Sequence, residues 1–397
     1  MINKNTDTYK WIVLFLSFMF MTLFALSLQS IPPLFSHIGN DIPLSDSQAG
    51  MLMGIYAVPG IFLPLFIGYL ATQFDNKLLI NIALLIMFTG LVGFAISKSF
   101  GILLLFRVIG GIGATILLVL APMMIAMFFD EKIGMAMGIF NAAVPFGTVI
   151  AANLFGPLAE LIHWRGAILN IAGLVAITFI VNLIFLYLPE HNGNGDTGQG
   201  ISNKNFWTNK KIWAVAFIWA LTNAQQQAYV TFGPQYYQLI GMNIYLSEFL
   251  TSLIMLVPGI LGLFMGMIID RFGRERNLII IGSVFIAICF LLLAKFTAAS
   301  TIIPMLIGIG VAPIPVIVYS LAPKIVEPQH IGLAMGLLTS FVNLGISAGP
   351  STFGIILENT NRNFSVGFII LALVSVATIF VSLNLDGTVN RKLDDAV

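Results

Sequence analysis

The sequence has 397 residues, of which 58% are hydrophobic and only 9% charged, and its formal net charge is +1. A soluble chain carries about 25% charged residues, so a water-facing surface of this size could not be covered here. Most of the surface must therefore face lipid, and the charge balance gives no indication of nucleic-acid binding. The only cysteine, Cys289, lies in an apolar run and excludes an intrachain disulfide.

Apolar runs of about 20 residues, the length that spans a bilayer as a helix, recur along the whole chain. The first, from Trp11 to Phe35, is too long for the apolar region of a signal peptide, so we interpret it as a membrane span. The pattern predicts twelve spans, near residues 11–35, 47–70, 78–97, 101–128, 134–158, 165–188, 211–240, 247–269, 277–295, 300–322, 332–357 and 365–385.

The longest polar stretch, Pro189 to Lys211, is rich in Gly and Asn and falls near the middle of the chain. Such a composition is typical of a flexible linker. We expect an N-terminal six-helix bundle over residues 1–188, a cytoplasmic linker over 189–210 and a C-terminal six-helix bundle over 211–397. The predicted fold class is an all-α membrane protein with two pseudo-symmetric bundles.

The distribution of positive charge predicts the orientation. With the N-terminus inside, thirteen of the 18 Lys and Arg residues fall in inner segments, and one, Arg107, falls within a span. The remaining four fall in outer segments: Lys98, Arg165, Lys295 and Arg362. This positive-inside bias predicts a multi-pass protein of the inner or plasma membrane with both termini in the cytoplasm.

The two halves of the sequence resemble each other at a constant offset. Gly332 lies 198 residues after Gly134, and the same offset relates five positions of residues 133–160 to residues 331–358. It also relates Gln29 to Gln227. Parallel six-span repeats are typical of transporters with a central path between the halves. Singly, each glycine is more simply explained by close helix packing.

A loop motif carries a resemblance to a known family. The stretch Gly266-Met-Ile-Ile-Asp270-Arg271-Phe272-Gly273-Arg274, between the eighth and ninth spans, resembles the signature loop of the major facilitator superfamily. The equivalent first-half stretch begins at Gly68 but has Thr72 in place of the aspartate. The resemblance implies that Gly266, Asp270, Arg271, Gly273 and Arg274 form a gate that holds one state of the transport cycle. The alternative is charge anchoring at the inner membrane face.

Shorter motifs support the same family. Residues 107–114, Arg-Val-Ile-Gly-Gly-Ile-Gly-Ala, resemble its arginine–glycine motif in the fourth span. Residues 163–167 (His-Trp-Arg-Gly-Ala) and 44–50 (Leu-Ser-Asp-Ser-Gln-Ala-Gly) resemble the branch of cyanate and nitroimidazole permeases.

Arg107 is the one basic residue predicted within a span, where a charge costs about 2.5–3.5 kcal/mol. It is therefore a candidate for contacting an anionic solute or controlling a proton site, although hydrogen bonds to backbone carbonyls would also explain it. The acids Glu160, Glu248 and Glu358 all fall at predicted outer ends. The sequence therefore favours exchange, facilitated diffusion or coupling through acids at the rim over proton symport through a central carboxylate.

Neutral polar residues are unusually dense at mid-depth, especially in the seventh span, and indicate a hydrogen-bonding path. The predicted substrate-binding set is Arg107, Gln29, Tyr56, Asn141, Asn223, Gln226, Tyr229, Tyr319 and Asn343. One cation among amides and tyrosines suits a small polar solute, including a singly anionic organic one.

These features favour a secondary transporter that works by alternating access between two halves. The alternatives are a multidrug/proton antiporter and a transporter-like sensor that binds solute without moving it. No catalytic constellation, metal site or ATP-binding loop is found in the sequence, so we expect no enzyme and no cofactor. The expected partners are the lipid bilayer and a small-molecule solute, with no nucleic acid, and the expected state is a monomer.

Overall fold

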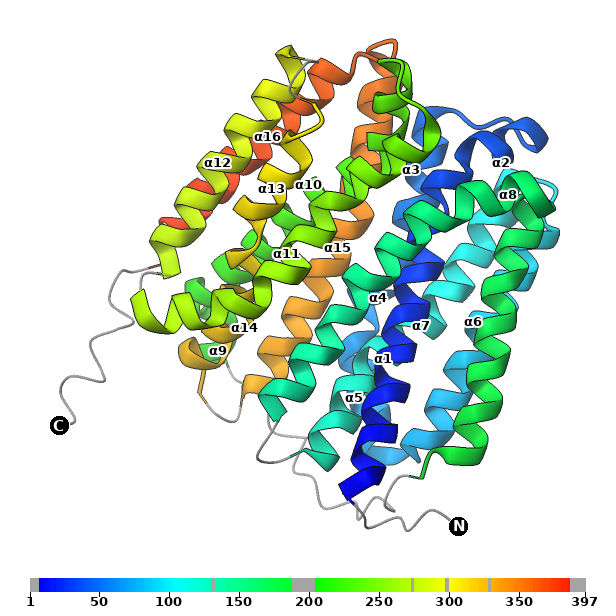
Figure 1. Ribbon diagram of the computed structural model, residues 1–397. Helices are drawn as coiled ribbons and strands as arrows, with labels where there is room; N and C mark the ends of the chain where they lie inside the picture. Colours follow the sequence, from blue (N-terminus) through cyan, green and yellow to red (C-terminus); the bar gives the residue numbers. More distant parts are fainter. Residues whose placement is uncertain are drawn as a thin grey trace. The chain divides into compact units, whose positions relative to one another are not determined.

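The computed structural model describes residues 7–129, 133–187, 204–272, 275–296, 300–327 and 330–385, and these ranges are helical apart from short connections (Figure 1). For a few residues inside helices, Thr72, Gly266, Asp270 and Arg271 among them, only the backbone is described. The chain forms two compact units, Met1–Thr197 and Gly198–Val397.

The first unit, coloured blue to green in Figure 1, contains helices α1 to α8 with two short 3₁₀ segments. Their bounds are α1 Asp7–Gln29, η1 Pro32–Leu34, α2 Phe35–Asp41, α3 Asp46–Gly54, η2 Ile55–Ala57, α4 Pro59–Phe62, α5 Pro64–Gln73, α6 Asn76–Ile96, α7 Phe100–Phe128 and α8 Ile133–Phe185.

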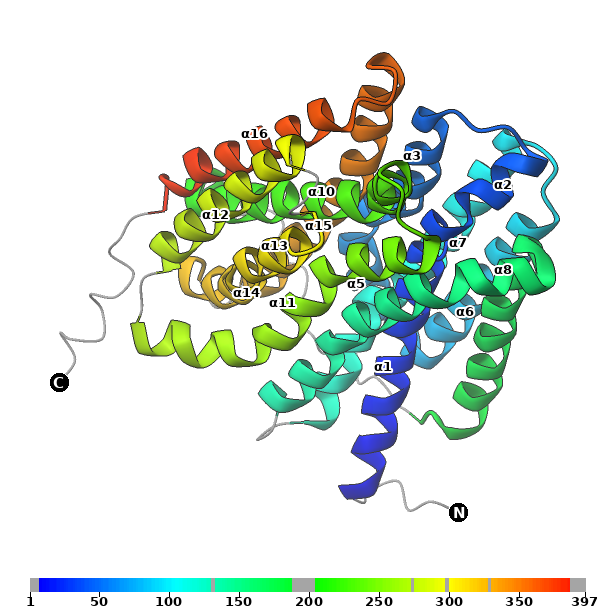
Figure 2. The ribbon, with the colours of Figure 1, turned by 45° about the horizontal axis from the view of Figure 1, so that its top comes forward.

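The second unit, coloured green to red, contains α9 to α16. Their bounds are α9 Lys204–Thr208, α10 Lys210–Leu239, α11 Ile244–Phe272, α12 Glu275–Lys295, α13 Ile303–Val311, α14 Pro313–Ile325, α15 Ile331–Asn359 and α16 Phe364–Ser382. Figure 2, turned by 45°, shows α12 and α16 running side by side as in Figure 1.

Nine helices of the described ranges are long and apolar enough to cross a membrane, and a bent pair, Asp46–Phe62 with Pro64–Ala71, gives a tenth. The 53 residues of α8 are interrupted at Ile162 and His163, which have non-helical backbone angles, so α8 divides into two span-length helices. The 30-residue α10 is also long enough but carries many amides, which lower its mean hydropathy. Together these elements correspond to the twelve predicted spans.

Glycines related by the repeat lie at positions where two helices pack closely against each other. A Cβ at Gly147 of α8 would lie 2.7 Å from Ala25 Cβ of α1, and a Cβ at Gly345 of α15 would lie 2.2 Å from the Ala220 carbonyl oxygen of α10. Gly345 lies 198 residues after Gly147. Each unit thus uses a glycine at the same repeat position to let two helix backbones approach.

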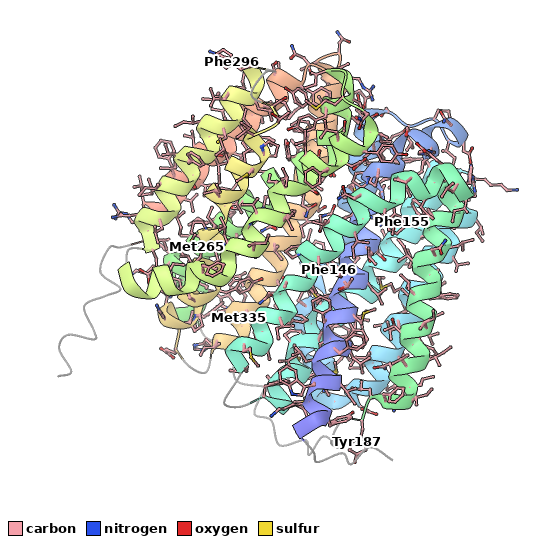
Figure 3. All side chains as sticks on the ribbon, in the orientation of Figure 1. Phe146, Phe155, Tyr187, Met265, Phe296 and Met335 are labelled. Carbon is pink, nitrogen blue, oxygen red and sulfur yellow. The ribbon has the colours of Figure 1, made fainter. Side chains whose placement is uncertain are left out.

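Large apolar side chains are exposed on both units. Phe146 of α8 is 52% exposed and Phe296, just after α12, is 56% exposed (Figure 3). Leu161, Phe62 and Phe380 are more exposed still. An exposed apolar surface of this extent suits a protein whose solvent is lipid.

The predicted linker and the predicted gate lie partly outside the described residues. Of the predicted linker 189–210, residues 189–203 lie outside the described residues, and the helix α9 occupies Lys204–Thr208. Of the predicted gate, Gly273 and Arg274 lie outside the described residues, and Gly266, Asp270 and Arg271 lie on the last turns of α11.

Candidate functional site

The candidate site of the first unit is built around Arg107 on α7. This residue is seven positions after the start of α7 at Phe100, about 10 Å along the helix axis. Its side chain is only 3% exposed. A guanidinium that is always charged is thus enclosed within a membrane helix bundle, where it needs strong acceptors.

Two backbone carbonyls accept hydrogen bonds from the guanidinium. Arg107 Nη1 donates to the Ser27 carbonyl at 2.7 Å, and Arg107 Nε donates to the Leu52 carbonyl at 3.0 Å. Ser27 lies in the last turn of α1 and Leu52 in the last turn of α3. The last four carbonyls of a helix lack partners within the helix and carry its negative dipole end. Arg107 therefore caps two helix ends at once.

The ring of Tyr56 provides a third contact. The Arg107 guanidinium carbon lies 4.2 Å from the ring centroid, a cation–π distance. Tyr56 belongs to η2, the short 3₁₀ segment after α3. The glycines of the arginine motif allow this approach: a Cβ at Gly111 would lie 2.1 Å from the Tyr56 carbonyl oxygen, and one at Gly110 would lie 3.3 Å from the Tyr56 ring. Because Gly110 and Gly111 are three and four residues beyond Arg107, all three share one helix face.

A small cavity, which we call the Arg107 chamber, lies beside these groups. Its lining comes from α1, η2, α6, α7, α8 and the residue before η1, namely Ser27, Ile31, Tyr56, Gly90, Leu91, Phe94, Phe106, Arg107, Gly110 and Ile168. The centre of a water molecule can occupy about 10 Å³ of this cavity, so the cavity holds about one water molecule.

Three polar atoms of the chamber lining have no well-aligned hydrogen bond with the described residues, although the Tyr56 and Ser27 hydroxyls interact with each other. The three atoms are Arg107 Nη2, the Tyr56 hydroxyl and Ser27 Oγ, all buried. Buried polar groups ordinarily have partners, so Arg107 Nη2, which has none among the described residues, indicates a place for a hydrogen-bond acceptor in the chamber. No lining residue is acidic, which leaves the charge of Arg107 uncompensated there. An anionic oxygen would therefore gain both a charge-assisted hydrogen bond and a counter-charge.

The structure brings two predicted site residues, Arg107 and Tyr56, into contact. Gln29 is the last residue of α1, two positions beyond Ser27, and it is buried without lining the chamber. Asn141 of α8 is exposed. Among the lining residues, Ser27 has no signal in the sequence that separates it from other serines of the spans.

In the second unit, the polar residues of α10 mostly bond within the unit. Asn223 is buried and donates to the Trp219 carbonyl of its own helix at 2.9 Å, and Gln226 is buried. The neighbouring Gln225 accepts a 2.6 Å hydrogen bond from Ser375 of α16. Gln225 therefore joins α10 to α16, whereas Asn223 bonds within its own helix.

The remaining candidates of the second unit differ in surroundings. Tyr229 is fully buried, and its hydroxyl lies 2.8 Å from that of Tyr237, which donates to the Ser300 carbonyl at 2.7 Å. Asn343 of α15 is buried and donates to Thr339 of its own helix. Tyr319 of α14 is 41% exposed and packs edge-on against a tryptophan.

A polar cluster at the break in α8, which we call the Asp41 clasp, gives a structural role to the motif of residues 163–167. Trp164 Nε1 donates to Asp41 Oδ2 at 3.0 Å, and Arg165 Nη1 donates to the same oxygen. Arg165 Nη2 also donates to the Ser97 carbonyl at 3.0 Å, and His163 Nε2 lies 3.4 Å from Asp41. The clasp ties the end of α2 and the end of α6 to the middle of α8.

Two six-helix units with lipid-compatible surfaces, and a buried arginine beside a small, mostly apolar cavity, are typical of a polytopic membrane protein. The family model of the Major Facilitator Superfamily matches residues 11–262 and 246–393. The chain belongs to this superfamily, whose members are transporters. The predicted family and the all-α fold of twelve transmembrane helices in two bundles are confirmed.

Several known proteins are similar to this chain. The multi-drug resistance efflux pump PmrA homolog of Lactococcus lactis subsp. lactis is 26% identical over 304 residues, 73% of each protein. The probable nitrate transporter NarT of Staphylococcus haemolyticus is 22% identical over 360 residues, 87% of this chain and 89% of the relative.

Solved structures show the same fold. A bacterial homolog of the human lysosomal transporter Spinster, in an inward-facing and occupied conformation, superposes with a TM-score of 0.80 and 16% identity, covering 96% of this chain and 97% of that one. A mutant form of the nucleoside transporter NupG gives a TM-score of 0.78 and 16% identity, covering 95% of this chain and 99% of that one.

Proposed function

We propose that this chain is a secondary transporter of a small polar organic solute with a single negative charge. The observation that carries the proposal is the enclosed Arg107 guanidinium, whose Nη2 faces a chamber that contains no acidic residue. The chamber holds about one water-sized group, so it suits one anionic oxygen of the solute rather than the whole molecule.

The transport cycle that we propose is alternating access between the two halves of a monomer in the plasma membrane, with both termini cytoplasmic. The loop of Gly266, Asp270, Arg271, Gly273 and Arg274 acts as the gate in this proposal, and the polar residues of the second half, Asn223, Gln226, Tyr229, Tyr319 and Asn343, contribute hydrogen bonds along the path, as do Gln29 and Asn141 in the first half. The likeness to a probable nitrate transporter supports a monoanionic solute.

Export of apolar or cationic drugs is the second candidate function. The likeness to a multidrug efflux pump favours it. A buried arginine without a compensating acid opposes the binding of a cation, so the two candidates differ in the sign of charge that they accept.

The thiol of Cys289 allows ligand binding to be tested by thermal unfolding of the purified protein. It is the single cysteine of the chain and is 1% exposed, so a thiol-reactive fluorophore reports unfolding of the purified protein. We expect methanesulfonate to raise the melting temperature, because a ligand at about 100 times its Kd adds about 2.7 kcal/mol. Nitrate, uridine and ethidium complete the panel, and Arg107→Gln is the variant that should lose the anion response.

Uptake into liposomes then separates binding from transport. Preloaded vesicles should exchange labelled methanesulfonate for unlabelled methanesulfonate, and Arg107→Gln vesicles should not. Stabilisation and transport of ethidium, with no response to either anion, would replace our proposal with drug export. Binding without exchange would indicate a sensor.

A further inference from the structure

Glu248 is a buried acidic residue of the second unit. It is the fifth residue of α11, the eighth predicted span, and its side chain is 3% exposed. The sequence placed this residue at the outer rim, where acids ordinarily face water. The structure keeps this residue in the first turns of α11 but shows its side chain buried, which is rare for an acid.

No described residue forms a hydrogen bond or an ion pair with Glu248. The three neighbouring hydroxyls on α11 are directed elsewhere: Ser247 Oγ donates to the Asn243 carbonyl at 2.8 Å, Thr251 Oγ1 to the Ser247 carbonyl at 2.8 Å, and Ser252 Oγ to the Phe249 carbonyl at 2.7 Å. The nearest charged residue of the same helix is Asp270, about 33 Å further along. The helix therefore offers nothing that would stabilise a carboxylate at this position beyond its own N-terminal dipole.

The helices packed against α11 do not supply a counter-charge to Glu248 either. A Cβ at Gly233 of α10 would lie 2.8 Å from Thr251 Oγ1, and this antiparallel register puts Glu248 level with Tyr236 and Tyr237. The hydroxyls of those tyrosines donate to the carbonyls of Leu293 and Ser300. The other titratable residues of α10 and α14 are Lys210, Lys211, Tyr229, Tyr319 and Lys324, and α13 has none.

The two lysines of α10 stand at its first two positions, more than 20 residues before the level of Glu248. Lys324 of α14 is 3.5 Å from Glu275, an acid at the start of α12. An ionised Glu248 would thus be buried without a cation or a hydrogen-bond donor among the described residues, an unfavourable state for a charged group.

We propose that Glu248 is a proton-binding site that couples solute movement to the proton gradient. The proton resides on the carboxyl oxygen while the side chain is enclosed, and leaves to water when the transport cycle exposes it. This inference rests on the proposed transport function, and it assigns the coupling to the outer part of α11 rather than to the Arg107 chamber.

Infrared spectroscopy tests the proton without any solute. A protonated carboxyl in a dry site gives a C=O stretching band that shifts in D₂O. Purified wild-type protein at neutral pH should show this band, and Glu248→Gln should lack it. Glu160→Gln is the matched control, because Glu160 is an exposed acid at the outer part of α8, and this variant should keep the band. Glu248→Asp should move the band rather than remove it.

Transport assays test the coupling. With labelled methanesulfonate, a pH difference of one unit should drive accumulation by up to about tenfold in wild-type vesicles for one proton per solute. Glu248→Gln should lose this accumulation and keep the exchange of labelled for unlabelled solute, because exchange needs no net proton movement. Glu160→Gln should behave as wild type.

The outcomes separate the two proposals. A carboxyl band that survives in Glu248→Gln overturns the proton site, and equal loss of exchange and accumulation shows a structural role and overturns the coupling. Accumulation driven by a sodium gradient instead of a pH gradient also overturns it. If wild-type vesicles exchange no methanesulfonate, the anion proposal fails, while the infrared result still decides whether Glu248 carries a proton.

Discussion

Arg107 and Tyr56 form a stacked pair, with the guanidinium carbon 4.2 Å from the centre of the tyrosine ring. The same guanidinium holds the carbonyls of Ser27 and Leu52, so one side chain joins α7 to the ends of α1 and α3. A solute that binds Arg107 Nη2 would therefore act on three helices of the first unit together. Solute binding at Arg107 would therefore change the contacts that hold these helices together.

Replacing Arg107 by lysine tests the importance of the forked geometry. Lysine keeps the charge but presents a single ammonium, which cannot reach two carbonyls in the directions that Nε and Nη1 reach. We expect Arg107→Lys to lose about 1.5–3 kcal/mol of stability, one charged hydrogen bond, and most anion binding. The Cys289 thiol assay measures both. Wild-type stability in Arg107→Lys would show that charge alone maintains the site.

Gly111 is predicted to be essential for the position of Tyr56. Its missing Cβ would lie 2.1 Å from the Tyr56 carbonyl oxygen, so Gly111→Ala must push η2 away from α7. We expect a loss of about 1–3 kcal/mol and reduced solute exchange. Gly101→Ala on the same helix is the control, because no atom lies within 4 Å of its Cβ. Equal effects of the two substitutions would contradict the packing that we describe.

The number and approximate positions of the membrane spans could be predicted from the sequence, because lipid imposes a length and an apolar composition on each spanning helix. The repeat and the loop motif then predicted the family. The bend within the second span and the sharp break of α8 at Ile162 and His163 could not be predicted, since both depend on local backbone angles.

The candidate site could be predicted only in part. Arg107 and Tyr56 were identifiable separately, as a charge and an aromatic hydroxyl within spans. Their contact could not be predicted, and neither could the carbonyl partners at Ser27 and Leu52. Every residue has a backbone carbonyl, so the sequence does not mark the ones that are left free at a helix end. Glu248 was expected at the outer end of its span and lies in the first turns of α11, but its burial was not predicted, because the position of a residue along a helix says nothing about what covers its side chain.

The repeat predicts matched effects of glycine substitutions in the two units. Gly345→Ala places a methyl group 2.2 Å from the Ala220 carbonyl oxygen, and Gly147→Ala places one 2.7 Å from the Ala25 methyl group. We expect both to lower the melting temperature, Gly345→Ala more, because its new methyl group meets the closer contact, 2.2 Å against 2.7 Å. Gly332→Ala, with no atom within 4 Å, is the control. A larger drop for Gly332→Ala would contradict this account.

The degenerate first-half loop predicts an asymmetric gate. Asp270 carries the carboxylate of the second-half motif, and Thr72 stands at the equivalent first-half position. We expect Asp270→Asn to reduce transport several-fold while Thr72→Val has little effect, with initial uptake rates at equal protein density as the measurement. Equal effects would indicate that the charge only anchors the loop at the membrane face.

His163 holds an unfavourable backbone conformation at the break of α8. Its φ of 65° and ψ of 154° lie in a region that glycine enters freely and other residues enter at a cost of about 1–3 kcal/mol. The ring compensates in part by lying 3.4 Å from Asp41, whose partners Trp164 and Arg165 complete the Asp41 clasp.

Two substitutions at this position separate strain from side-chain contact. His163→Ala removes the ring and keeps the strain, so it should destabilise the protein, whereas His163→Gly removes both. We therefore expect His163→Gly to melt higher than His163→Ala, by the equivalent of about 1 kcal/mol. This order is the reverse of the usual preference for alanine within helices. Alanine melting higher than glycine would mean that the break relaxes without cost, and the Asp41 clasp would then not be holding the chain in a strained turn.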